Sequence, residues 1–211
     1  MRALAAAAAV ISLLVLPPGR ASWLAAAGLG FVTTASLAWM GHGAATEVAL
    51  GPMHLLSDVV HALAAAVWIG ALVALVLLAL NRSPSAAKNT ALHTALRRFS
   101  GVGSAAVAVL VITGVINAWV LVGPGRVTDL LATPYGRVLA LKVLLFAAML
   151  ALAAVNRFRL TPEFGRALYE DGQPKRALAA LRRSLALETG TALLVLLLVA
   201  WLGTLAPPAA G

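Results

Sequence analysis

Long apolar runs alternate with short polar connections along the 211-residue chain. An apolar helix needs roughly 20 residues to cross the hydrocarbon core of a bilayer, and most of these runs approach or exceed that length. The runs are continuously apolar, so they do not fit the alternating strands of a β-barrel. We therefore predict an all-α integral membrane protein, a single transmembrane domain over residues 1–211 with about six helices. The predicted spans are residues 3–16, 23–40, 53–80, 99–122, 138–156 and 185–205.

The first apolar run, residues 3–16, has two interpretations. Arg2 followed by an apolar stretch of this length is typical of a signal peptide. The residues that follow, Gly19-Arg20-Ala21-Ser22, lack a convincing small-x-small cleavage site. We favour a short first transmembrane helix over a cleaved signal, and the sequence leaves both open.

The composition agrees with a membrane location. Hydrophobic residues make up 62% of the chain and charged residues 11%, and the mean hydropathy is +0.95. A soluble domain is about 45–50% apolar and about 25% charged. Cysteine is absent, which excludes disulfides and thiolate metal sites. The net charge of +9 does not indicate nucleic-acid binding, because no basic patch is interleaved with aromatic residues. Membrane lipid is the expected environment.

The basic residues predict the orientation, because cytoplasmic loops of membrane proteins collect lysine and arginine. Of the 16 Lys and Arg residues, twelve lie after the first, third and fifth predicted spans. They are Arg20, Arg82, Lys88, Arg97, Arg98, Arg157, Arg159, Arg166, Lys175, Arg176, Arg182 and Arg183. We expect this side to be cytoplasmic, which puts both termini outside in a bundle of six spans.

The span over residues 53–80 carries polar chemistry near its start. His54, Asp58 and His61 are spaced i, i+4, i+7, so a helix places all three on one face. Ionisable side chains within a membrane span are costly and usually face a bundle interior or a cavity. These three residues are therefore candidates for function.

Further candidate ligands flank this segment on the side predicted to be outer. Met40 and His42 end the preceding span, and Met53 begins the span that carries His54 and His61. A loop of about ten residues joins the two spans, so we expect their ends to be close. Imidazole suits copper and zinc, whereas thioether favours Cu(I). We predict a copper site, for Cu(I) or Cu(II), with ligands drawn from these five residues. Packing by the methionines and inter-helix hydrogen bonding by the histidines are the simpler alternatives.

Asp58 and Lys142 have a structural interpretation. With a rise of about 1.5 Å per residue, Asp58 lies roughly 9 Å below Pro52 and Lys142 about as far below Gly136. We expect them to form a buried pair, in which Asp58 neutralises Lys142 and orients an imidazole instead of binding metal.

Two further ionisable residues are expected to be structural. His93 lies in the basic segment before residue 99, so we expect it to be solvated in a cytoplasmic loop. Glu188 begins the last span, and we expect it to pair with Arg157 or Arg98.

Several short motifs occur in a definite order from Trp39 to the end of the chain. They are Trp39-Met40-Gly41-His42, Asp58-x-x-His61-x-Leu63-Ala64-Ala65-x-x-Trp68-x-Gly70, Arg98-Phe99-Ser100, Thr113-Gly114 followed by Trp119, Thr133-Pro134-Tyr135-Gly136-Arg137 with Lys142, Asn156-Arg157, and Glu188. In order and spacing they resemble the CopD family of bacterial copper-resistance and copper-import membrane proteins. One departure is Ala71, where the family has a second glycine.

The resemblance implies a multi-pass helical bundle in the bacterial inner membrane that moves copper from the periplasm towards the cytoplasm. It also implies a periplasmic copper carrier, which this chain lacks as a fused domain, so a separate donor protein is expected. Residues 64–78 of the third span are without ionisable side chains. Fast passage of copper is therefore expected to need a conformational change, an oligomer or another partner.

Two other functions compete with copper transport. A b-type haem electron-transfer protein would use two histidines as axial ligands, but the candidate histidines all lie towards one membrane face. A scaffold that only docks partners would not need the histidines. The sequence contains no nucleotide-binding loop, which argues against direct ATP drive. We predict a transport or homeostasis protein and not an enzyme.

Overall fold

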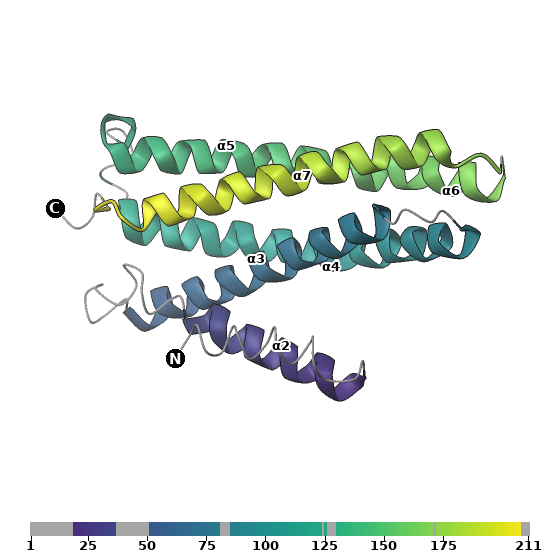
Figure 1. Ribbon diagram of the computed structural model, residues 1–211. Helices are drawn as coiled ribbons and strands as arrows, with labels where there is room; N and C mark the ends of the chain where they lie inside the picture. The colour runs from purple at the N-terminus through teal and green to yellow at the C-terminus, as the bar shows by residue number, and fades with distance from the viewer. Residues whose placement is uncertain are drawn as a thin grey trace. The chain divides into compact units, whose positions relative to one another are not determined.

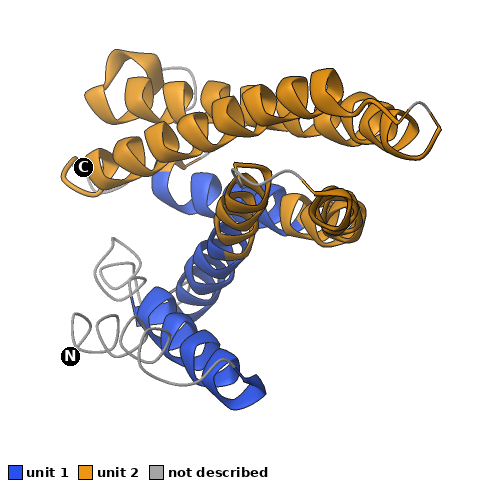
Figure 2. Ribbon diagram, turned by 45° about the vertical axis from the view of Figure 1, so that its right-hand side comes forward, with its two compact units in different colours: residues 1–66, 109–121 blue, residues 67–108, 122–211 orange. Residues whose placement is uncertain are grey.

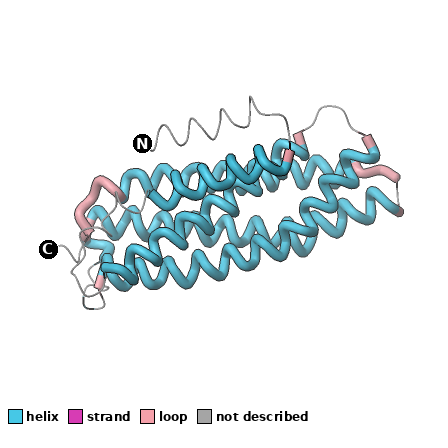
Figure 3. The backbone as a smooth tube through the Cα atoms, turned by 90° about the horizontal axis from the view of Figure 1, so that it is seen from below, coloured by secondary structure: helices cyan, strands magenta, loops and turns pink. Residues whose placement is uncertain are grey.

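The computed structural model describes residues 19–36, 51–80, 85–123, 125, 130–170 and 172–207, and every regular element in these ranges is helical (Figure 1). The elements are α2 (Arg20–Ala35), α3 (Gly51–Ala79), α4 (Ala86–Val122), the 3₁₀ turn η4 (Leu130–Ala132), α5 (Pro134–Val155), the π segment η5 (Asn156–Leu160), α6 (Thr161–Tyr169) and α7 (Lys175–Leu202). No strand occurs in these described parts (Figure 3). The all-α prediction is confirmed for them.

Four helices within the described residues are long and apolar enough to cross a membrane. They are Pro52–Ala79, Ala86–Val122, Pro134–Tyr169 and Lys175–Leu202. The helix α2 has 16 residues, and the first predicted span, residues 3–16, lies outside the described residues. The prediction of a membrane-spanning helical protein is therefore confirmed, while the number of six spans and the outward termini stay predictions.

Three helices extend further than the predicted spans, and one of them, α7, begins at Lys175, ten residues before the expected start at residue 185. The helix α4 begins at Ala86, 13 residues before the expected start at residue 99, so part of the expected basic loop is helical. Beyond α5, the chain continues without a break through η5 into α6. Pro162 stands in the first turn of α6, where a missing N–H can be accommodated. The π segment precedes it directly, and the N–H of Thr161 bonds to the carbonyl of Asn156.

The described helices belong to two compact units, coloured separately in Figure 2. The first comprises residues 1–66 and 109–121, and so contains the first half of α3 and the later part of α4. The second comprises residues 67–108 and 122–211.

In the second unit, α5 packs along α7. One buried cluster consists of Val122, Tyr135, Val138 and Leu202, with Leu130, Leu139, Leu198 and Leu205 packed against it. The Trp68 and Phe146 rings meet edge to face at 5.9 Å, a favourable aromatic geometry. At the end of α3, Arg182 Nε donates to the carbonyl of Ala79 at 2.6 Å. A cation at this position satisfies a terminal carbonyl and complements the helix dipole.

The start of α5 explains the motif Thr133-Pro134-Tyr135-Gly136-Arg137 in structural terms. Thr133 caps the helix, since its Oγ1 accepts the N–H of Gly136 at 3.0 Å. A Cβ on Gly136 would lie 1.8 Å from the carbonyl oxygen of Leu130, so only glycine fits here. The side chain of Arg137 donates to the carbonyls of Leu131 and Ala132 in the η4 turn. The motif therefore fixes the turn from which α5 starts.

Candidate metal-binding site

The first half of α3 presents its polar side chains on one face, as the spacing predicted. His54 is completely buried, Ser57 is buried, and the side chain of Asp58 is 24% exposed. His61, one turn after Ser57, is half-buried. Helical periodicity alone positions these four residues, and what distinguishes them is their partners within the same unit.

The imidazole of His61 is held by α4. Its Nδ1 lies 2.8 Å from the hydroxyl oxygen of Thr113. That hydroxyl has a single hydrogen, and it donates this hydrogen to the carbonyl of Val109 at 2.6 Å. With the Thr113 hydrogen assigned to the Val109 carbonyl, the Thr113 oxygen accepts from His61, and this assignment puts the ring hydrogen on Nδ1. In the neutral imidazole this tautomer puts the lone pair on Nε2, as a metal ligand requires.

Asp58 is held one turn further along α4. Asn117 Nδ2 donates to Asp58 Oδ1 at 2.7 Å, and the second carboxylate oxygen lies 3.7 Å from His54 Nε2. The second distance is too long for a hydrogen bond, but it is short enough for strong attraction if His54 is protonated. The carboxylate therefore lies directly beside one of the two predicted metal-binding imidazoles.

A third hydrogen bond joins α3 to α4. Ser57 Oγ donates to the backbone carbonyl of Thr113 at 3.3 Å. We call this set of residues the polar seam. Its members are His54, Ser57, Asp58 and His61 on α3 and Thr113 and Asn117 on α4.

Only three of the five predicted ligands lie among the described residues. His54 and His61 share the seam, and Met53 lies one residue before it with a side chain 53% exposed. Met40 and His42 lie outside the described residues. Within the parts that are described, no three His, Asp or Glu side chains gather closely enough to hold a metal ion. The five-residue copper site therefore stays a prediction.

The predicted pair of Asp58 and Lys142 also stays a prediction. Asp58 lies in the first unit and Lys142, on α5, lies in the second. The expected role of Asp58 beside an imidazole agrees with its position next to His54, whereas its bond to Asn117 was not expected.

The expectation for Glu188 was wrong. Its carboxylate accepts a hydrogen bond from Asn156 Nδ2 at 2.7 Å, and it forms no ion pair with an arginine in the described residues. Arg157 instead donates to the backbone carbonyl of Ser100 at 3.2 Å and to the hydroxyl of Ser104.

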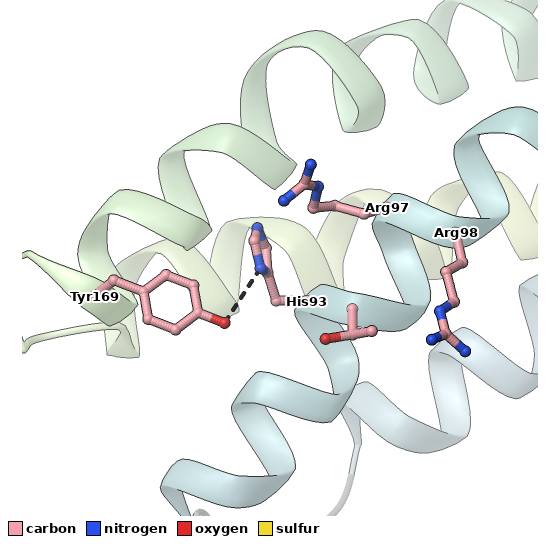
Figure 4. A pocket seen from close by; sticks show the side chains of 5 residues that line it. His93, Arg97, Arg98 and Tyr169 are labelled. Atoms are coloured by element: carbon pink, nitrogen blue, oxygen red, sulfur yellow. Dashed lines mark hydrogen bonds between the residues drawn. The ribbon is translucent and has the colours of Figure 1, made fainter.

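The expectation that His93 lies in a loop was wrong, because this residue lies on α4 and packs against α6, although its side chain is only half-buried (Figure 4). Its ring meets those of Phe164 and Tyr169 edge to face at 6.2 and 5.5 Å. A Cβ on Gly165 would come within 2.7 Å of His93 Nε2. The glycine therefore makes room for the imidazole, which is part of the packing between α4 and α6.

Sequence reasoning missed Asn117 and the role of Thr113 as a partner of His61. A signal for both exists in the sequence. They are polar residues one turn apart in the apolar stretch of α4, and such residues in a membrane helix usually bond to a neighbouring helix.

Comparison with known proteins gives a family match. The family model described as copper resistance protein D (CopD) matches residues 93–202. Over 208 residues, 98% of this chain, the sequence is 41% identical to the copper resistance protein D of Pseudomonas syringae pv. tomato, of which it covers 66%. No solved structure matches the chain significantly.

Two further relatives are more distant. The inner membrane protein YebZ of Escherichia coli K12 is 33% identical over 137 residues, 64% of this chain and 46% of the relative. The copper transport protein CutJ of Bacillus subtilis 168 is 35% identical over 124 residues, 59% of this chain and 22% of the relative. The chain thus spans less than two thirds of the length of each of these three relatives.

Proposed function

This chain belongs to the CopD family of copper resistance proteins, and from that premise we propose that it binds copper at the periplasmic face of the inner membrane and passes it towards the cytoplasm. A multi-pass inner-membrane location agrees with the four apolar helices among the described residues and with the relatives of the chain. Copper is the cargo in this proposal.

The polar seam is the observation that carries the proposal. Thr113 fixes the tautomer of His61 so that Nε2 is the nitrogen that would meet a metal ion. A hydrogen bond of this kind from the other ring nitrogen is the usual support of a ligating histidine. Asp58 places a carboxylate beside His54, and a carboxylate near a bound cation offsets its charge.

The chemistry of the ligands favours copper. Imidazole binds copper and zinc, and thioether sulfur prefers Cu(I). Met53 stands next to His54 at the start of α3, and Met40 and His42 precede it in the sequence. Because two histidines are too few for a closed site, we propose that the remaining ligands come from these three residues.

The direction of transport rests on charge. The start of α3 lies opposite the ends that carry most of the basic residues, which we assign to the cytoplasm. The seam would then face the periplasm, where a separate copper carrier could deliver the ion. To complete the passage, the proposal requires a conformational change, an oligomer or another partner.

The haem alternative is the weaker one. Axial ligands must approach a haem iron from opposite sides, whereas His54 and His61 project from one face of the same helix. None of the three relatives above is named as a cytochrome.

The test is the copper content of purified protein after loading with Cu(I) or Cu(II). The double variant His54→Gln with His61→Gln should lose stoichiometric copper, while its helical circular dichroism stays that of the wild type. His93→Gln is the matched control, because it removes an imidazole that packs against α6 and should leave copper binding intact. Undiminished copper in the folded double variant would refute the proposal.

A further inference from the structure

The second unit contains a cavity that the proposed copper site does not use. It has a volume of about 890 Å³ and lies among α3, α4, α5–α6 and α7. Its wall includes apolar side chains such as Leu72, Leu96 and Leu150, and the exposed residues Arg157 and Tyr169 stand at its mouth. The buried polar groups of its wall include Glu188 and Asn156.

Glu188 is an unusual residue for this position. It is only 2% exposed and lies in a helix apolar enough to span the membrane. Its hydrogen-bond partners are the amide of Asn156 and the side chain of Trp68, both of which are neutral. Among the described residues no lysine, arginine or histidine forms an ion pair with it. The groups that bond directly to its carboxylate are therefore neutral dipoles.

A buried carboxylate without a counter-ion can become neutral by taking up a proton. An ionised group without a counter-ion in an apolar interior costs enough free energy that it tends to take up a proton instead. Glu188 and Asn156 line the cavity. Where water fills it, a proton can reach and leave the carboxyl group without any movement of the helices.

Asn156 is equipped to serve both forms of the carboxyl group. Its Nδ2 donates to the carboxylate in the structure, while its Oδ1 is buried without a hydrogen-bond partner among the described residues. A protonated carboxyl group has one O–H donor. Rotation of the amide would let Oδ1 accept that hydrogen, so each protonation state has a partner on the same side chain.

We propose that Glu188 is a reversible proton-binding site, loaded from the water-accessible cavity, with Asn156 as the positioning residue for both states. In this step a hydronium ion in the cavity transfers one proton to a carboxylate oxygen and becomes water, and the reverse step returns the proton to water. No metal takes part, so the inference is independent of the proposed copper function.

The protonation equilibrium of Glu188 also depends on the charged groups of the helices around the cavity. The part of α3 in this unit, residues 67–79, has none. On α7, Arg182 and Arg183 stand six and five residues before Glu188, about 9 and 7.5 Å along the helix axis, and no ionisable residue follows Glu188 up to Leu202. Lys142, 14 residues before Asn156 on α5, is about 21 Å away along the helix axis. The ionisable residues that line the cavity besides Glu188 are His93, Arg97, Arg157, Arg166, Tyr169 and Glu170.

The test is an infrared pH titration of copper-free full-length protein whose glutamate carboxyl carbons carry ¹³C. A protonated glutamic acid gives a C=O stretching band that the label shifts. We expect one such component to titrate reversibly in the wild type and to be missing from Glu188→Gln. Glu163→Gln is the matched control, because Glu163 lies on α6 in an exposed pair with Arg159, and it should retain the component. Identical titrations of folded wild type and Glu188→Gln would overturn the proposal.

A second variant covers the case in which Glu188→Gln does not fold. Asn156→Leu removes a hydrogen bond to the charged form, which is stronger than one to the neutral acid. We expect the midpoint of the same component to rise by about one pH unit or more. An unchanged midpoint in that variant, or a wild type without any reversible glutamic acid component, would also overturn the proposal.

Discussion

The substitution Thr113→Val probes the polar seam most sharply. Valine keeps the branched shape of threonine and removes only the hydroxyl group. That hydroxyl accepts the Nδ1 hydrogen of His61 and donates to the carbonyl of Val109. The backbone carbonyl of Thr113, which Ser57 uses, is unaffected. The variant therefore removes the support of one imidazole while the ligand itself remains.

The expected size of the effect follows from what the hydroxyl does. Losing the hydrogen-bond partner of a ligating histidine typically weakens metal affinity about 10- to 100-fold, which corresponds to about 1.4–2.7 kcal/mol. The fold itself should lose about 1–3 kcal/mol at most, because the ring nitrogen left without its partner belongs to a half-buried residue.

The assay is a copper titration against a competing chromophoric chelator. Thr189→Val is the matched control, since Thr189 makes the same bond to the carbonyl four residues before it, at Leu185, and has no histidine partner. We expect the control to bind copper like the wild type. A dissociation constant for folded Thr113→Val within twofold of the control would refute the reasoning that the seam prepares His61 for a metal ion.

Three glycines give further predictions about stability. Gly136→Ala should destabilise the protein by about 3 kcal/mol or more, because the new Cβ would lie 1.8 Å from a backbone oxygen and the Thr133 cap would be lost. Gly101→Ala, with nothing within 4 Å of its Cβ, should be neutral or slightly stabilising; equal melting temperatures for the two variants would contradict this. Gly165→Ala should cost about 1–3 kcal/mol in the wild type and much less with His93→Ala, since it crowds that imidazole. Equal losses in both backgrounds, measured by thermal unfolding, would argue against the contact.

The helices could be predicted because their signal is local. A run of apolar residues long enough to span a bilayer predicts a helix whatever surrounds it, and α3 begins within two residues of the predicted start at residue 53. The start of α4 could not be obtained this way. Its first 13 residues are polar enough to resemble a loop, and they are helical where His93 packs against α6 through Gly165.

In the candidate site, too, the features that depend on one helix could be predicted and those that depend on helix packing could not. The shared face of His54, Asp58 and His61 depends only on the periodicity of one helix, so the sequence predicted it. The partners depend on which helix packs against that face. Charge led to the expectation that Glu188 pairs with an arginine, yet the structure gives it the neutral amide of Asn156. Opposite charge was a poor guide here because burying an ion pair is expensive, whereas an amide satisfies a carboxylate at lower desolvation cost.

The spacing of polar residues on two helices contains information that neither helix contains alone. From Asp58 to His61 the chain advances three residues along α3, while their partners go back four residues along α4, from Asn117 to Thr113. Antiparallel helices with the same rise per residue require this reversed and nearly equal step. A polar side chain in an apolar helix needs a partner at the same depth. Matching the two spacings would therefore have paired both residues from sequence alone, and one further turn of this register brings His54 level with Leu121.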